Sequence, residues 1–100
     1  MSDRLLTLLC PPTVEEKLLD ELLLLDQVQV FTSAPTAAHG VDNHLLDASE
    51  QVMGRARAVA VQAVVREDDA AALLANLRDR FRGTGLRYWI TPVLESGELK

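Results

Sequence analysis

The chain has 100 residues and a mass of 11.0 kDa, which is enough for one modest hydrophobic core and too little for that core plus a separate catalytic domain. Hydrophobic residues make up 48% of the chain and exclude an intrinsically disordered protein. The formal net charge of −5 and the 4% of aromatic residues argue against nucleic acid as a partner, because phosphate backbones attract basic surfaces and bases stack on aromatic rings. We therefore expect one folded domain over residues 1–100.

Cysteine usage and hydropathy favour a cytoplasmic protein. The one cysteine, Cys10, can form no disulfide within the chain and belongs to no pair with the spacing of a structural zinc site. The apolar run at residues 5–10 stops at Pro11 and Pro12, so it is too short to span a membrane and poorly flanked for a secretion signal. We expect no direct membrane insertion.

A strand and a helix are predicted first along the chain. Residues 4–10 are apolar on both alternating faces, which is typical of a central strand that is covered on two sides. After the two prolines, Thr13 and Glu16 have the T-x-x-E spacing of a capping box and predict that a helix begins there. The apolar face of this helix consists of Leu18, Leu19, Leu22, Leu23 and Leu25.

A second strand is predicted at residues 28–34, followed by a polar segment at residues 35–52. Loops of this length in small domains are usually functional or disordered. Both histidines, His39 and His44, lie in this segment together with Asp42. The segment therefore concentrates a polar surface that is suited to ligand binding.

The second half of the chain predicts a strand, a helix and a strand. Residues 55–66 are apolar on both faces and indicate another central strand. The next helix is expected to be capped by Asp68 or Asp69 and to end at Gly83 and Gly85. Its apolar positions repeat with helical spacing at Ala70, Leu73, Leu74, Leu77 and Phe81. The last strand is expected at residues 86–93.

This order of elements predicts a ferredoxin-like α+β fold, βαββαβ, with a four-stranded antiparallel sheet and both helices on one face. The two most apolar strands are then central, and the last strand lies at an edge that tolerates Pro92. Two helices cover only one side of such a sheet. Because large apolar patches are rarely left exposed on monomers, we expect the other face to be covered by oligomerisation.

Four short blocks of the sequence resemble a known group of proteins at compatible spacings. They are LCPP at residues 9–12, FTSAPTAAHG at 31–40, EQVMGRAR at 50–57 and YWITPVLE at 88–95. Together with the order of elements, they are similar to PII-like proteins of the nitrogen regulatory PII superfamily. The narrower resemblance is to a small proteobacterial family that is often encoded beside heavy-metal efflux systems.

The resemblance implies a homotrimer that binds a small ligand in clefts between subunits. It also implies that the segment at about 35–52 is a T-loop-like element that reports to a protein partner, such as a membrane metal-efflux system. PII proteins hold ATP with a lysine in a glycine-rich turn and with arginines after the last strand, whereas the turn here is RGTG at residues 82–85 and no arginine follows the strand. We therefore expect nucleotide binding to be weak or absent.

Candidate ligand-binding residues cluster around the polar segment and the cleft that the resemblance implies. Arginines are the natural contacts of an anion, although ion pairs with neighbouring acids explain them equally well. His39 and Gly40 could instead form the bent end of a strand. Trp89 could instead pack at an interface or under a helix. The candidates are His39, Gly40, Glu50, Gln51, Gly54, Arg55, Arg57, Arg82 and Trp89. Arg87 is a further arginine that, with Arg55, Arg57 and Arg82, could replace the missing phosphate clamp.

Divalent metal binding, as in CutA-like trimers, is the alternative function. His39, Asp42 and His44 offer nitrogen and oxygen ligands, but their spacing matches no recognised metal motif. Enzyme activity is not expected, because no serine, cysteine or paired carboxylate has the sequence context of a catalytic group.

Overall fold

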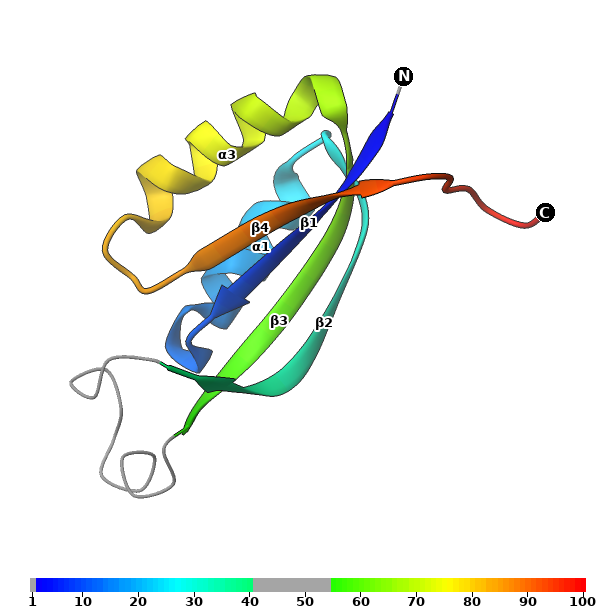
Figure 1. Ribbon diagram of the computed structural model, residues 1–100. Helices are drawn as coiled ribbons and strands as arrows, with labels where there is room; N and C mark the ends of the chain where they lie inside the picture. The colour runs from blue at the N-terminus through cyan, green and yellow to red at the C-terminus, as the bar shows by residue number, and fades with distance from the viewer. Residues whose placement is uncertain (1, 41–54) are drawn as a thin grey trace.

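The computed structural model describes residues 2–40 and 55–100 and contains one four-stranded sheet with helices on one face (Figure 1). The strand order is β2-β3-β1-β4, and every neighbouring pair is antiparallel. This confirms the α+β ferredoxin-like prediction. The elements are β1 (Asp3–Cys10), a 3-10 helix η1 (Pro12–Val14), α1 (Glu15–Leu24), β2 (Val28–His39), β3 (Arg55–Arg66), α3 (Glu67–Phe81) and β4 (Arg87–Val93).

The core lies between the sheet and the two helices. Side chains alternate between the faces of a strand, and the register places Leu6 opposite Ala63 and Leu8 opposite Val61 on the face that the helices cover. We call this the helix face. The helices contribute the buried side chains of Leu18, Leu22, Leu73, Leu77 and Phe81.

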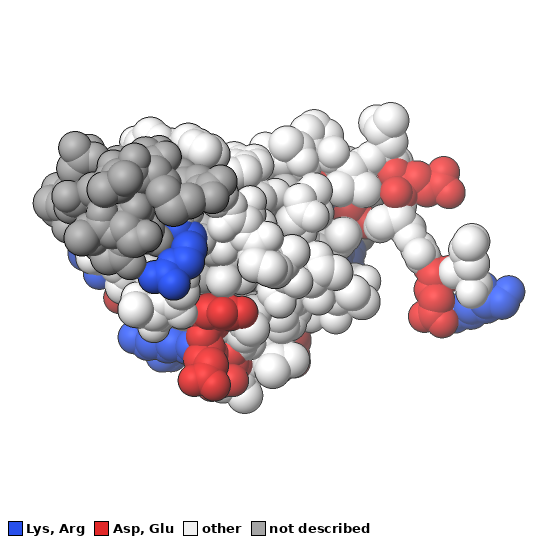
Figure 2. Space-filling view, turned by 90° about the horizontal axis from the view of Figure 1, so that it is seen from below, with Lys and Arg blue, Asp and Glu red and all other residues white. Residues whose placement is uncertain are grey.

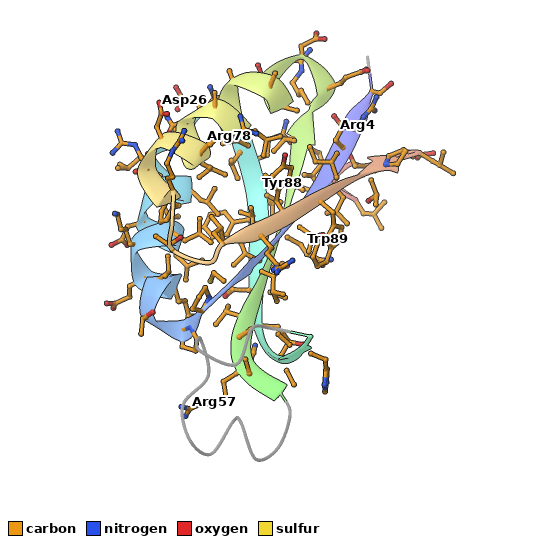
Figure 3. The ribbon with its side chains drawn as sticks, turned by 60° about the vertical axis from the view of Figure 1, so that its left-hand side comes forward. Arg4, Asp26, Arg57, Arg78, Tyr88 and Trp89 are labelled. Carbon is orange, nitrogen blue, oxygen red and sulfur yellow. The ribbon has the colours of Figure 1, made fainter. Side chains whose placement is uncertain are left out.

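The remaining side chains of the strands form the open face, which no helix of the described residues covers. Adjacent residues at the edge strand β4 illustrate the division, because Tyr88 points towards α3 and Trp89 lies on the opposite side of the sheet (Figure 3). Pro92 is in the edge strand, as expected.

Strand β2 is longer than the sequence predicted. Its ladder with β3 continues from Pro35 opposite Val59 to His39 opposite Arg55, so the expectation of a loop from Pro35 was wrong as far as His39. A proline is tolerated here because β2 is an edge strand. The rest of the predicted loop, residues 41–52, lies outside the described residues.

Both predicted helix caps were wrong. Thr13 lies in η1, and Val14 is the N-cap of α1, with no side-chain hydrogen bond at that cap. Helix α3 begins at Glu67, ahead of Asp68 and Asp69. At α3 the Glu67 backbone N–H donates to the carbonyl of Ser2 at 2.9 Å, so the pairing of β3 with the start of the chain continues up to the first residue of the helix and fixes where the helix begins.

The end of α3 follows the prediction. Gly83 and Gly85 have φ values of +76° and +87°, which residues with a side chain rarely adopt. Between them, the backbone N–H and the hydroxyl of Thr84 both donate to the Phe81 carbonyl, at 3.2 and 2.6 Å. This turn sets the position at which β4 begins.

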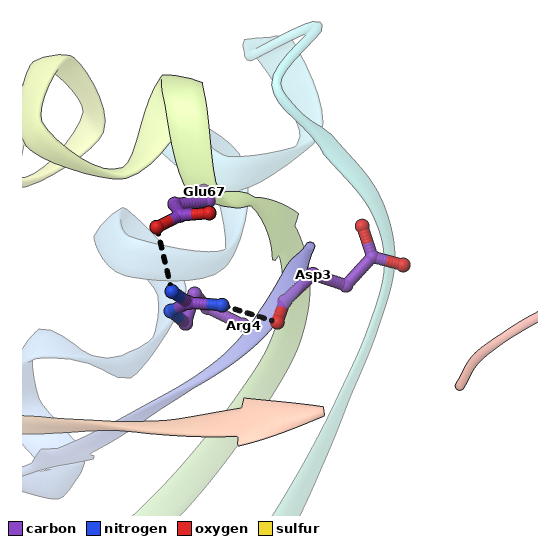
Figure 4. Close-up of polar contacts among 3 residues, drawn as sticks. All are labelled: Asp3, Arg4 and Glu67. Carbon is purple, nitrogen blue, oxygen red and sulfur yellow. Dashed lines mark hydrogen bonds and ion pairs between the residues drawn. The ribbon is translucent and has the colours of Figure 1, made fainter. Parts of the chain in front are cut away.

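Polar contacts join distant segments around the core. Arg4 of β1 forms an ion pair of 2.7 Å with Glu67 and donates a hydrogen bond of 3.1 Å to the Asp3 carbonyl (Figure 4). Arg80 of α3 pairs with Glu21 of α1 at 2.9 Å. Among residues 2–40 and 55–100, the helices are all too short or too polar to cross a membrane.

Candidate functional site

A pocket of about 640 Å³ opens at the end of the sheet where β1 stops and β4 starts. Its walls come from residues 9–13, from Ala38 and residues 56–58 of the β2–β3 hairpin, and from residues 84–87. Three parts of the chain therefore meet there. The volume lies within the range of roughly 300–1,000 Å³ that is common for small-molecule sites.

Two arginines give the pocket a preference for anions. Arg57 comes from β3 and Arg87 is the first residue of β4, and both side chains are exposed. Arg57 projects at the hairpin end of the molecule (Figure 3). A guanidinium group can bind a carboxylate or phosphate. Alternation along the strands assigns Arg57 to the helix face and Arg87 to the open face. The site is thus locally basic in a chain whose net charge is −5.

Charge is unevenly distributed over the surface. Charged side chains of both signs gather at both ends of the view in Figure 2, with most of the Lys and Arg beside the grey atoms, whereas uncharged residues cover its middle. Salt at physiological strength screens charges beyond about 8 Å. A ligand in the pocket therefore responds chiefly to the nearby arginines rather than to the net charge of the chain.

Cys10 lies in the wall of the pocket but is not a reactive group. Its side chain is buried at 1% exposure. Burial raises the pKa of the thiol, and the negative charge of Glu15 raises that pKa further. The thiol is therefore protonated at neutral pH and is a poor nucleophile and metal ligand.

Gly85 gives one wall its close packing. A Cβ added at this residue would lie 3.4 Å from Cγ of Pro11. The backbone of the turn therefore packs closely against Pro11, just after β1. The positive φ of Gly85 favours glycine as well. Glycine at this position therefore serves both the turn and the shape of the pocket.

The structure places the predicted site residues in different regions. Arg57 lines the pocket, whereas Arg82 lines a second groove beside α3 that meets the pocket at Gly85 and Leu86. Trp89 lies on the open face. His39 ends β2, and Gly40 follows with a φ of +79°, which agrees with the strand-end alternative. Arg55 begins β3 opposite His39.

Several predicted residues cannot be placed. Glu50, Gln51, Gly54, Asp42 and His44 lie outside the described residues. In the described part of the chain, no group of three or more His, Cys, Asp or Glu side chains is arranged to hold a metal ion. Two of the three proposed metal ligands are thus beyond the described ranges, and the metal site stays a prediction.

Arg87 is the residue that sequence reasoning could name but not select. It was one of four arginines that could contact an anion, and only the register shows which of them share a pocket. Arg87 pairs with Leu9 at the end of β1, and Leu9, Arg57 and Arg87 all line the pocket. The available signal was its position directly after a glycine turn, where a strand begins.

The comparisons with known proteins identify a family and a shared fold. The model of a family described as "Protein of unknown function (DUF3240)" matches residues 1–100. A DUF3240 family protein from Shewanella baltica has a crystal structure with a TM-score of 0.82 at 20% identity, and the match covers 100% of this chain and 99% of that one. No curated protein matches the chain.

A second solved structure links the fold to the resemblance seen in the sequence. It is a Thermus thermophilus protein provisionally described as a PII-like signalling protein, with a TM-score of 0.67 and 17% identity. The match covers 93% of this chain and 88% of that chain. Because the identities are low, these two structures show a common fold and leave the ligand of this chain open.

Proposed function

The chain belongs to the DUF3240 family, and from this premise and its PII-like fold we propose that it is a non-enzymatic signalling or sensor protein. In this proposal, the protein is a homotrimer that binds a small anionic ligand and reports to a protein partner. The observation that carries the proposal is the position of Arg57 and Arg87 on one pocket of about 640 Å³. Among the described residues that line the pocket, no group has the character of a catalytic nucleophile.

The open face supports the homotrimer. Trp89 is 49% exposed there, and Leu5, Leu9 and Val64 are only partly buried. The register places all four on this face. An apolar surface of this kind usually marks an interface, and a second and third copy of the chain would complete its burial.

The ligand is expected to be smaller or less charged than ATP. A triphosphate needs several converging donors, and the pocket offers two guanidinium groups and the backbone of the turn at residues 84–86. The turn lacks the lysine of PII proteins. We therefore propose a small organic anion as the ligand, with weak or absent nucleotide binding.

The connection between β2 and β3 is the proposed reporter. The pocket is lined by Ala38 near the end of β2 and by Ala56 near the start of β3, so a ligand there would contact both strands that lead into this connection. A ligand can shift the connection only if it binds one of its conformations more tightly. The protein partner, for which a metal-efflux system is the candidate, would then recognise that conformation.

Isothermal titration calorimetry on the intact protein tests the ligand class. The probes are ATP, ADP, cyclic nucleotides, a panel of small dicarboxylates and phosphorylated acids, and divalent copper, zinc, cobalt and nickel. We expect an organic anion to bind, and Arg57→Ala or Arg87→Ala to weaken its binding at least tenfold. Arg82→Ala is the matched control, because this arginine lines the other groove, and it should leave binding unchanged.

Two outcomes would replace this proposal. Binding of metals alone, lost in the double variant His39→Ala with His44→Ala, would favour the CutA-like alternative. Tight binding of ATP with magnesium that raises the melting temperature by several degrees, and that disappears in Arg57→Ala, would return the protein to the nucleotide-sensing class.

A further inference from the structure

A second, smaller groove lies between α3 and β4 on the helix face. Its floor is apolar and includes Leu77, Phe81 and Leu86, and its volume is about 190 Å³. Pockets that hold drug-sized ligands have volumes of roughly 300–1,000 Å³. The groove is therefore of a size for one or two side chains of a peptide rather than for an organic cofactor.

Two arginines stand at the rim of this groove. Arg78 and Arg82 line it together with the half-exposed Tyr88, and Figure 3 shows Arg78 and Tyr88 on neighbouring elements. Neither arginine side chain forms an ion pair with any residue in the ranges 2–40 and 55–100. A complementary occupant thus carries an apolar side chain next to carboxylates.

The segment after β4 has this chemistry. Residues 94–100 read LESGELK and extend away from the sheet at the end opposite the α3–β4 turn (Figure 1). Leu94 and Leu99 are fully exposed. Glu98 directly precedes Leu99, so an acid and an apolar side chain are adjacent on a segment that buries neither leucine.

The segment cannot reach the groove of its own chain. The Ser96 hydroxyl donates a hydrogen bond of 2.5 Å to Asp3, and Asp3 is opposite Val93 at the far end of β4 from Tyr88. At about 3.3 Å per residue, the five residues from Val93 back to Tyr88 span about 17 Å, whereas the three residues from Ser96 to Leu99 cover about 10 Å. As long as Ser96 stays bound to Asp3, an occupant with this sequence comes from another copy.

We propose that the segment at residues 94–100 of one copy docks in the α3–β4 groove of a second copy. Leu99 enters the apolar groove, and Glu98 forms an ion pair with Arg82 or Arg78 at its rim. This contact uses the helix face and the edge strand β4 and not the open face, and it borders the ligand pocket at Gly85 and Leu86, which line both. It gives copies of the chain a second point of attachment.

Disulfide trapping tests the contact. The double variant Leu99→Cys with Arg78→Cys is oxidised at low micromolar concentration, and covalent products are separated on a non-reducing gel. We expect covalent oligomers to form at least tenfold faster than in the matched double variant Leu94→Cys with Arg78→Cys, whose introduced cysteine starts from an equally exposed leucine. The native Cys10 is buried and contributes little background.

Charge reversal provides a second measurement on the same trapping variant. Glu98→Arg should slow trapping severalfold, Arg82→Glu should do the same, and the two together should restore the rate. Equal trapping at positions 94 and 99, an oxidised monomer with a disulfide inside one chain, or no recovery in the combined charge reversal would overturn the proposal. Each of these results leaves the calorimetric test of the ligand pocket unaffected.

Discussion

The two faces of the sheet differ in composition and in how far the chain itself buries them, because the open face mixes leucines with polar residues such as Thr7 and Gln62. On β1, Leu6 and Leu8 point to the helix face and are fully buried, whereas Leu5 and Leu9 point to the open face and are only partly buried. The helices account for the difference, since both pack on one side. We infer that the helix face maintains the fold and that the open face is adapted to contact with another molecule.

A charge on the helix face should have the most severe consequence. Val61 is 0% exposed, so Val61→Asp would bury a carboxylate without a partner and should lower the free energy of unfolding by more than about 4 kcal/mol. Far-UV circular dichroism with urea denaturation measures this change. A cooperatively folded Val61→Asp protein with a near-native urea midpoint would show that the helix face does not maintain the fold.

The same substitution on the open face should have a different result. Val64 neighbours Leu5 in the register and is partly buried, so its aspartate can keep contact with water in a single subunit. We expect Val64→Asp to retain a native circular dichroism spectrum, with a loss of stability of about 1 kcal/mol, and to abolish assembly in sedimentation velocity. An assembled Val64→Asp protein would show that another surface holds the copies together.

The extent to which the sequence predicts this molecule depends on which interactions are local. Periodicity sufficed for the order of strands and the end of α3, because alternation and glycine turns are local signals. The start of α3 was missed because the pairing of β3 with Ser2 and Asp3, which are distant in sequence, runs up to Glu67. The sequence could not predict that Arg57 and Arg87 line the same pocket, because only the register between the strands places them at the same end of the sheet.

Cys10 tests where the helix face ends, because it is a helix-face residue at the margin of the pocket. Its pKa in the folded protein is raised above the ordinary 9.0. The folded state therefore holds the proton more tightly than the unfolded state, and the associated stability is complete below pH 9.0 and is lost as the pH rises through the folded-state pKa. The slope cannot exceed about 1.4 kcal/mol per pH unit.

Urea denaturation between pH 8 and pH 11 measures this dependence, with Cys10→Ala as the reference that has no thiol. We expect the stability of the native protein to fall more steeply above about pH 9 than that of the variant. Parallel curves for the two proteins would mean that water reaches Cys10 from the pocket. Cys10 would then belong to the pocket rather than to the buried helix face.

The ion pair that joins β1 to the start of α3 should matter least. Arg4 and Glu67 are 2.7 Å apart, but their side chains are 26% and 50% exposed, so water and salt screen the attraction. Glu67→Gln should lower the free energy of unfolding by about 0.2–1 kcal/mol, and the difference should shrink at high salt. A loss of several kcal/mol would indicate that this pair supports the helix face as the apolar core does.

Sedimentation equilibrium at micromolar concentration decides whether other copies of the chain cover the open face. We predict a single species with three times the 11.0 kDa mass of the chain. In that species Trp89 is shielded from water, and its fluorescence emission should shift to longer wavelength when Val64→Asp separates the copies. A well-folded protein with the mass of one chain at the same concentration would mean that the open face is left uncovered, contrary to the role inferred for it.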